Sequence, residues 1–197
     1  EADDVIGTMA QWASDELEVT IVSGDKDFYQ LIRPGVRVLD IMKDKVIGNE
    51  EVHAKFGVGP GGVIDVLALA GDSSDNVPGV AGIGAKTAAK LMGEYGSLEE
   101  ILKNAPNIKG KRGETLVAES DLARLSKQLV TIKTDVEHGL QLGELAKSGG
   151  QKETLKSLFM EWQFRSHLKD LLTDSDDSES APPTSLPAAT YRGITTA

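Results

Sequence analysis

The stretch Pro78-Gly-Val-Ala-Gly-Ile-Gly-Ala-Lys-Thr87 decides how the rest of this sequence is interpreted. Apolar residues with helical spacing precede it and follow it, so it connects two helices that each bury one face. The glycines at 82 and 84 let the backbone take positive φ and approach a ligand closely, while Ile83 between them anchors the turn. The stretch is therefore typical of a helix-hairpin-helix.

The hairpin is predicted to bind the phosphates of DNA. Free amides at the start of the second helix suit an anion, and Lys86 in the first helical turn is unfavourable against the helix dipole unless an anion lies nearby. Such contacts position a duplex without reading its sequence. A Gly-x-Gly pair also has a purely geometric explanation, which stays open at this point. The predicted DNA-binding residues are Gly82, Ile83, Gly84, Lys86, Thr87 and Lys90.

Composition limits the other classes of function. The chain has 197 residues, 40% of them hydrophobic, and a formal net charge of −10, which argues against a generic nucleic-acid binder. Residues 86–112, however, hold six basic residues against three acidic ones, so one stretch can face phosphates. The absence of cysteine leaves oxygen or imidazole as the ligands for any metal. No apolar run approaches the roughly 18 residues of a membrane span, so the expected location is the cytoplasm, without a membrane partner.

Upstream of the hairpin, helix and strand alternate as in α/β proteins. Apolar spacing predicts a helix from the first residues to Ala13, and β-branched runs predict strands at 19–22, 36–39 and 46–47. Asn49 is expected to cap a helix that ends at Phe56.

Downstream, the chain is predicted to be mainly helical. Ser97 and Glu100 form a capping box for a short helix, and Leu122, Leu125 and Leu129 indicate another helix. Residues 130–136 are expected to be extended or a strand, and apolar positions between 155 and 168 outline one last helix.

Three groups of carboxylates stand at the ends of predicted elements. Each has an ordinary explanation, as helix-start acids, as a polar turn after a strand, or as an Asx turn. Gathered at one sheet edge, however, ionised carboxylates would repel one another unless a hard cation neutralised them. We therefore expect them to bind magnesium as ligands, and the histidines show no spacing that would make them catalytic. The predicted metal ligands are Glu1, Asp3, Asp4, Asp25, Asp27, Asp72 and Asp75.

Several motifs, taken in order, closely resemble the 5′-nuclease domain of bacterial DNA polymerase I, a relative of the flap endonucleases. They are EADDVIG at 1–7, SGDKDF at 23–28, LAGDSSDNVPGVAGIGAKTA at 69–88, LSKQLVTIKTD at 125–135 and FRSHLKDL at 164–171. The resemblance covers about residues 1–172. It implies an α/β fold, with a partial sheet of the PIN and flap-endonuclease type and a helix-hairpin-helix subdomain.

The same resemblance implies a chemistry. It implies two Mg²⁺ ions, with Mn²⁺ as a substitute, one held mainly by Glu1, Asp3 and Asp25 and the other by Asp27 and the two aspartates after Gly71, with Asp4 close by or acting through water. It also implies a potassium ion at the hairpin. The activity implied is 5′-to-3′ exonucleolytic and flap-cutting hydrolysis of nicked or branched DNA, in replication and repair, in a bacterial protein near the nucleoid.

The resemblance also suggests how the chain is organised. We expect the last part of the nuclease core at 1–48, a helix-hairpin-helix subdomain with closing helices at 49–172, an acidic Pro/Ser linker at 173–190 and the start of linked polymerase domains at 191–197. Family members carry further metal-binding aspartates and a basic helical arch upstream, so this chain is expected to be a fragment. The alternatives are a DNA-binding module without nuclease activity and a PIN-type ribonuclease, which would not need the hairpin.

Overall fold

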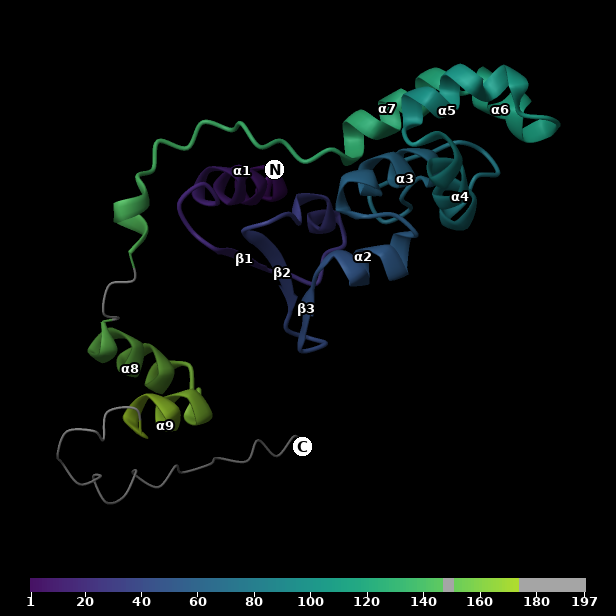
Figure 1. Ribbon diagram of the computed structural model, residues 1–197. Coiled ribbons are helices and arrows are strands. Elements are labelled where there is room, and N and C mark those ends of the chain that lie inside the picture. The colour runs from purple at the N-terminus through teal and green to yellow at the C-terminus, as the bar shows by residue number, and fades with distance from the viewer. Residues whose placement is uncertain (147–150, 174–197) are drawn as a thin grey trace, which may run out of the picture. The chain divides into compact units, whose positions relative to one another are not determined.

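Figure 1 shows the computed structural model, which describes residues 1–146 and 151–173. The chain divides into two compact units, Glu1–Leu142 and Gly143–Ala197, and each is described by itself. The expected linker from residue 174 on, and the expected start of a following domain, lie outside the described residues. Within the described ranges, no helix is long and apolar enough to cross a bilayer.

A three-stranded sheet forms one part of the first unit. Its strands are β1 (Val19–Val22), β2 (Val36–Asp40) and β3 (Lys45–Ile47), with β1 parallel and β3 antiparallel to the central β2. The register aligns Ile21, Val38 and Ile47 in one row, and all three side chains are buried, so this row is the sheet's contribution to the core. Helix α1 (Ala2–Ala13) precedes the sheet and contacts β1.

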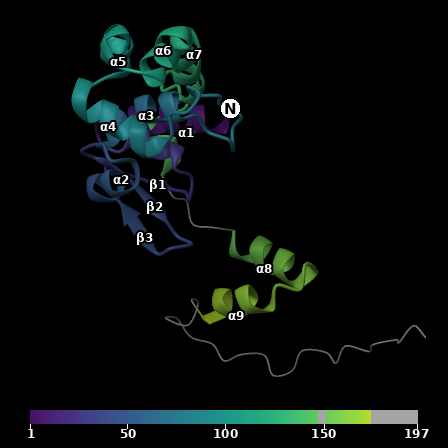
Figure 2. The ribbon, with the colours of Figure 1, turned by 90° about the vertical axis from the view of Figure 1, so that its right-hand side faces the viewer.

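The remaining elements of the first unit are helical, and both ribbon views show α3 to α7 gathered together beyond the sheet (Figures 1 and 2). They are η1 (Asp27–Leu31), α2 (Asn49–Phe56), η2 (Pro60–Gly62), α3 (Val63–Ala70), α4 (Ala85–Tyr95), α5 (Leu98–Asn104), η3 (Ala105–Asn107), α6 (Lys111–Ala118) and α7 (Ser120–Val130).

Helix α3 is the centre of this helical part. Its sequence VIDVLALA is apolar almost all round, and Val63, Val66 and Leu69 are fully buried. It packs against α4, which follows the hairpin, and against α7 from much further along the chain. Beyond α7 the chain is extended and returns to α1, where the Lys133 and Val136 amides donate to the Asp4 carboxylate and the Thr8 hydroxyl. The two helices that the hairpin connects, α3 and α4, are thus both packed in the core.

The second unit contains η4 (Leu142–Leu145), which begins at its boundary, and the helices α8 (Lys152–Glu161) and α9 (Arg165–Thr173). A turn with Gln163 at φ 58° separates the two helices. The expectation of one last helix over this region was therefore wrong.

Most other predictions of elements are confirmed, with informative exceptions. The α/β class, the strands and the helices on both sides of the hairpin agree with the structure, and residues 131–136 are extended but not a strand. Helix α2 is capped at Gly48, whose amide donates to Glu51 Oε2 at 2.9 Å, so Asn49 is inside the helix. Helix α6 was not predicted.

The helix that Leu122, Leu125 and Leu129 indicated is confirmed as α7, but two of these leucines lie outside its buried face. Leu125 and Leu129 are 47% and 58% exposed, whereas Ala123, Ser126 and Val130 are buried, and α7 packs against α3. Small side chains let the two helices approach closely, and this requirement outweighs the burial of leucine.

Candidate metal centre and helix-hairpin-helix

Three of the predicted carboxylates converge in the folded chain. Asp27, Asp72 and Asp75 each present a carboxylate oxygen, and these oxygens lie within 4.8 Å of one another. Asp27 begins η1 after strand β1, while the other two follow α3. The end of strand β1 and the end of helix α3 therefore bring carboxylates from distant parts of the sequence close together.

The position of Asp72 is fixed by a tight loop. Its amide donates to the Val77 carbonyl at 2.9 Å and its carbonyl accepts from the Val77 amide at 2.8 Å, which closes the loop. Asp72 Oδ1 accepts from the Ser74 amide at 3.0 Å, as in an Asx turn. Only 7% of Asp72 is exposed, so its second oxygen is held inside the group.

Asp27 lies in an environment that disfavours its charge. Burial, followed by the neighbouring charges of Asp25, Asp72 and Asp75, raises the pKa of Asp27 from 3.8 to about 6, although the nearby Lys26 ammonium acts in the opposite direction. Such a carboxylate gains a favourable partner when a cation binds beside it.

Lys26 supplies a positive charge inside this group. Its Nζ lies 2.6 Å from Asp72 Oδ2 and 3.8 Å from Asp27 Oδ1. Burial alone would raise the pKa of Asp72, but the contacts with Lys26 and with the Ser74 amide outweigh it and hold that pKa below its usual value. Burial likewise acts to lower the pKa of Lys26, and the carboxylates of Asp72 and Asp27 more than offset it and raise that pKa.

The other predicted ligands lie outside the three-carboxylate group. Partial burial, and then the charges of Asp25, Glu1, Asp4 and Asp75, raise the pKa of Asp3, which shows that these acids share one electrostatic environment. Asp25 shapes the loop, since its Oδ1 accepts the Asp27 amide at 3.0 Å. Asp4 Oδ1 accepts a hydrogen bond from the Lys133 amide at 2.8 Å, so one of its two carboxylate oxygens already has a structural partner.

The three-carboxylate group fits a hard divalent cation. Asp27 Oδ1 and Asp72 Oδ2 are buried oxygens that lack a well-oriented hydrogen-bond donor among the described residues. Carboxylate oxygen is the ligand that Mg²⁺ and Mn²⁺ prefer, and the converging charges favour an ion of charge two. The charges of Asp25, Glu1 and Asp75 are among the causes that raise the pKa of Asp3, so a cation nearby would relieve repulsion among these acids as well.

The helix-hairpin-helix begins at the end of the loop of residues 71–79, which carries Asp72 and Asp75 and is called the metal loop below. Gly82 has φ +74° and Ile83 is buried, as the sequence predicted, whereas Gly84 has φ −93° and forms the extended N-cap of α4. No neighbouring atom lies within 4 Å of a Cβ built at either glycine, so both face open space. A ligand can thus approach the backbone closely at these two positions.

Side chains of α7 and of Glu119, the residue before it, accept hydrogen bonds from the hairpin loop. The Gly79 amide donates to the buried Ser126 Oγ at 3.1 Å, and the Ala81 amide donates to Glu119 Oε2 at 2.7 Å. The Val80 and Ile83 amides bond to backbone carbonyls. These contacts occupy the upstream amides, whereas the amides of Ala85 and Lys86, the first two of α4, have no hydrogen-bond acceptor among the described residues.

The basic residues of the hairpin are available for an anion. Lys86 is exposed in the first turn of α4, and among the described residues it forms no ion pair. Lys90 is exposed one turn later and lies 3.8 Å from Glu94, while Thr87 is half-buried and its amide donates to Gly84. Lys86 is therefore the hairpin cation least compensated by acids.

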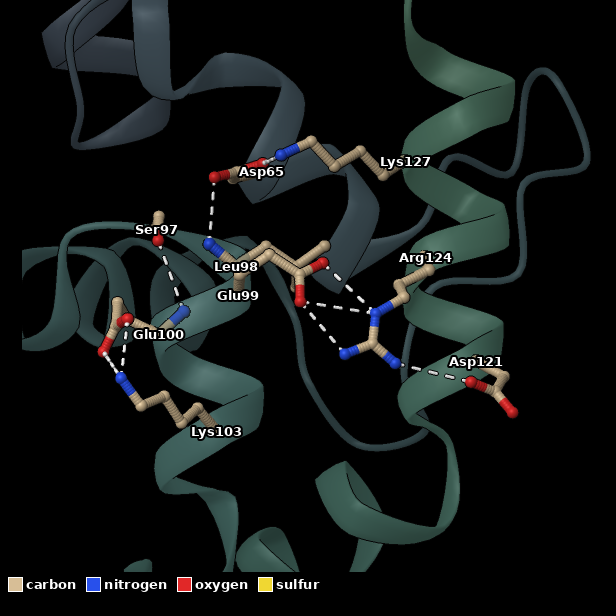
Figure 3. A network of polar contacts seen from close by, with 9 residues as sticks. All are labelled: Asp65, Ser97, Leu98, Glu99, Glu100, Lys103, Asp121, Arg124 and Lys127. Atoms are coloured by element: carbon tan, nitrogen blue, oxygen red, sulfur yellow. Dashed lines mark hydrogen bonds and ion pairs between the residues drawn. The ribbon is translucent and has the colours of Figure 1, made fainter.

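A polar network holds α3, α5 and α7 together (Figure 3). Asp65 of α3 is buried, and its Oδ2 accepts the Leu98 amide at the start of α5 at 2.9 Å while its Oδ1 lies 2.6 Å from Lys127 Nζ of α7. Arg124 of α7 pairs with Glu99 of α5 at 3.0 Å. The network fixes the helices that carry the hairpin and its supports.

Sequence reasoning missed four residues that shape these sites. Lys26 lies between two predicted ligands, and this position was a signal that a cation could enter the acidic group. Asp65, Glu119 and Ser126 support the helices or the hairpin through contacts across 33 to 47 residues, which no local pattern reveals.

Comparisons with known proteins agree with this geometry. Residues 1–57 match the family described as the N-terminal resolvase-like domain of 5′-3′ exonuclease, and residues 58–153 match the family described as its C-terminal SAM fold.

Similar curated proteins are bacterial DNA polymerases I. The chain is 52% identical over 147 residues to that of Rhizobium leguminosarum, covering 74% of this chain and 14% of the relative. It is 41% identical over 186 residues to that of Bacillus caldotenax, covering 91% and 21%, and 41% identical over 187 residues to that of Pseudomonas aeruginosa, covering 90% and 20%. The chain thus spans about a fifth or less of the length of these relatives.

Similar solved structures are nucleases of bacteriophage T5. A mutant T5 5′-exonuclease aligns with a TM-score of 0.63 and 26% identity over 68% of this chain and 56% of that one. The zinc-bound T5 5′-exonuclease gives 0.62 and 26% over 66% and 49%. The phage flap endonuclease, in a pseudo-enzyme–product complex with DNA and metal ions, gives 0.63 and 25% over 68% and 50%.

Proposed function

Because this chain belongs to the 5′-3′ exonuclease family of bacterial DNA polymerase I, we propose that it is part of a nuclease that hydrolyses DNA phosphodiesters near 5′ ends and flaps. The T5 relatives bound to divalent ions and to DNA support the proposal. The expected boundaries at residues 48 and 172, and the linked polymerase domains, belong to the same proposal.

One observation carries it: the metal loop and the DNA-binding hairpin share one short connection. Asp72 and Asp75 follow α3 directly, and the hairpin glycines come just before α4. The connection is stiff, because the Asp72–Val77 pair closes it and the Val80 amide donates to the Leu69 carbonyl at 2.8 Å. A phosphate held at α4 is therefore placed at a defined position relative to the carboxylates.

In this proposal the carboxylates act as ligands. Asp27, Asp72 and Asp75 would hold one divalent ion, and Glu1, Asp3 and Asp25 would contribute to a second, with Asp4 supporting them. Mg²⁺ or Mn²⁺ bound there supplies activation of a water and stabilisation of the phosphate charge. The loop contacts keep the ligand oxygens in place, so that the chain loses little entropy when the centre is loaded.

The hairpin would hold the DNA backbone beside this centre. The amides of Gly84 and the first turn of α4, with the Lys86 ammonium, would bind a phosphate, and Lys90 and Thr87 would extend the contact along the duplex. Gly82 and Ile83 would set the shape of the loop, and a potassium ion at the hairpin belongs to the same proposal. None of these contacts reads a base, so selectivity would come from the shape of the DNA end.

A second candidate is a DNA-binding module without nuclease activity. The observation that favours it is the contrast between the two sites: the hairpin has its full set of loop contacts, whereas the compact acidic group has three carboxylates. A metal site with fewer ligands binds its ions more loosely.

Binding and cleavage of a 5′-flap DNA, measured separately with Mg²⁺ and with a chelator, distinguish the two. The chain would be compared with a longer version that carries the upstream sequence of the protein. We expect the longer version to cut the flap in Mg²⁺ and not in chelator. In that version, Asp72→Asn should slow cutting by about 100-fold or more, while the affinity for DNA changes by less than about twofold. Asp15→Asn, an exposed carboxylate after α1, is the control. A longer version that binds the flap without ever cutting it would make the DNA-binding module the correct function.

A further inference from the structure

Lys26 contacts two of the carboxylates that the proposed metal centre would use. Its ammonium lies 2.6 Å from Asp72 Oδ2 and 3.8 Å from Asp27 Oδ1. These are two of the three buried side-chain oxygens that lack a well-oriented hydrogen-bond donor among the described residues; the third, Asp65 Oδ1, lies elsewhere, against Lys127. The side chain of Lys26 is 27% exposed, so the pair is partly shielded from water.

A divalent ion and this ammonium cannot share those oxygens without cost. Mg²⁺ sits about 2.1 Å from its carboxylate ligands, so an ammonium that stays on the same oxygen would lie within a few ångströms of a second positive centre. Repulsion at that distance is strong in a partly buried site. Binding of the ion therefore requires the Lys26 side chain to move.

The backbone allows such a movement without unfolding the loop. The Lys26 carbonyl accepts the Tyr29 amide at 3.1 Å, which starts η1, and Asp25 Oδ1 accepts the Asp27 amide at 3.0 Å. The main chain on both sides is thus fixed, whereas the four methylenes of a lysine can rotate.

We propose that Lys26 is a built-in counter-ion of the metal centre, which neutralises Asp72 and Asp27 while no divalent ion is bound and has to be displaced when one binds. The inference rests on the proposed metal centre. It has two consequences: Lys26 keeps the acidic loop folded without metal, and it weakens the affinity of the centre for divalent ions. The nuclease would then load its ions at a higher concentration than the carboxylates alone require.

The same geometry elsewhere in the chain provides a matched comparison. Lys43 Nζ lies 2.5 Å from Asp40 Oδ2, and Asp40 is as deeply buried as any carboxylate in the described residues. The pair belongs to no group of three or more metal-ligating side chains in the described part of the chain, so it offers no comparable metal site. Lys43→Met removes a lysine–aspartate contact of the same kind without touching the acidic group.

The test measures Mg²⁺ and Mn²⁺ binding by titration calorimetry, without DNA, for the wild-type chain, Lys26→Met and Lys43→Met. Thermal unfolding is recorded in chelator and in Mg²⁺. We expect Lys26→Met to tighten the Kd for Mg²⁺ by about tenfold, within the usual range of coupling between competing ligands. The same variant should unfold at a lower temperature in chelator and recover more on adding Mg²⁺. Lys43→Met should keep the wild-type Kd.

Two further variants keep the outcome decisive. Lys26→Arg retains the charge and should bind Mg²⁺ no tighter than wild type, and Lys26→Gln replaces Lys26→Met if the latter does not fold in chelator. Wild-type or weaker Mg²⁺ affinity in the neutral variant overturns the role of Lys26, while loss of binding in Asp72→Asn would still support the metal centre. If the wild-type chain binds no divalent ion and Asp72→Asn changes nothing, the proposed centre itself is wrong, and the role of Lys26 with it.

Discussion

Two glycines at the start and end of the metal loop allow the chain to pass very close to itself. Gly71 has φ +74° and Gly79 has φ +64°, a region that only glycine enters without strain. A Cβ at Gly71 would lie 2.8 Å from the Val77 and Pro78 carbonyl oxygens, and a Cβ at Gly79 would overlap the backbone of Gly71. The close crossing holds Asp72 and the hairpin in one unit, so both sites depend on these two positions.

Gly79→Ala is therefore expected to destabilise the fold by about 2–4 kcal/mol, because strained backbone and overlap with the main chain both oppose the new methyl group. Gly93→Ala is the control, since Gly93 is an exposed glycine inside α4 with no atom within 4 Å of a built Cβ. It should stabilise α4 by about 0.5–1 kcal/mol. Urea unfolding of both variants measures the two effects. Equal stability of the variants would contradict the tight crossing.

At the scale of single elements, helix α3 holds α5 through a buried charge. Asp65 caps α5 by accepting the Leu98 amide, and Lys127 of α7 completes the contact (Figure 3). Arg124 makes a second bridge on the exposed side, to Glu99 and to Asp121. The inner contact is shielded from water and the outer one is not, so they should differ in energy.

Asp65→Ala is expected to cost about 1–3 kcal/mol, because it leaves a buried amide at Leu98 without an acceptor. The larger penalty of an unpaired buried ion does not apply in full, since the Lys127 side chain is 39% exposed and can reach water. Asp121→Ala, whose carboxylate is fully exposed, should change stability by less than about 0.5 kcal/mol. Chemical denaturation compares them. A cost in Asp121→Ala as large as that in Asp65→Ala would show that the network does not depend on burial.

The elements also show what could be predicted from the sequence. Helices α3 and α4 end at glycines, and β1 is a β-branched run, so local patterns were sufficient for them. The face of α7 was not predictable, because it depends on how closely α3 approaches Ala123 and Ser126. The same holds for the hairpin supports.

The carboxylates divide in a similar way. Asp27 follows strand β1, where the rule that sites form at strand ends applies, and its meeting with Asp72 was expected because gathered carboxylates need a cation. That Lys26 lies on their oxygens depends on the conformation of one flexible side chain, which spacing does not determine. The positions of residues were thus predictable where the backbone decides them, and not where a contact between distant helices or a single rotamer decides them.

On the scale of the whole molecule, the proposed function requires attraction to DNA to overcome a net charge of −10. The acidic group lies close to the hairpin in the chain, so phosphates would meet repulsion next to attraction until cations neutralise the carboxylates. Binding should therefore depend on few basic residues, and Mg²⁺ should strengthen it. Lys86, exposed and without an ion pair among the described residues, is the cation best placed to contribute.

Lys86→Ala should weaken binding to duplex or flap DNA and reduce the slope of log K against log salt by about 0.9, the value for one lost phosphate contact. Lys90→Ala should have a smaller effect, because Lys90 already lies 3.8 Å from Glu94. Lys103→Ala removes an exposed lysine of α5 that pairs with Glu100, and it should leave the slope unchanged. Fluorescence anisotropy over a salt series, at constant Mg²⁺, measures all three. A local phosphate contact at the hairpin predicts that the salt slope falls only for substitutions in α4. If Lys103→Ala lowers the slope as much as Lys86→Ala does, the attraction comes from the diffuse charge of residues 86–112 and not from the hairpin.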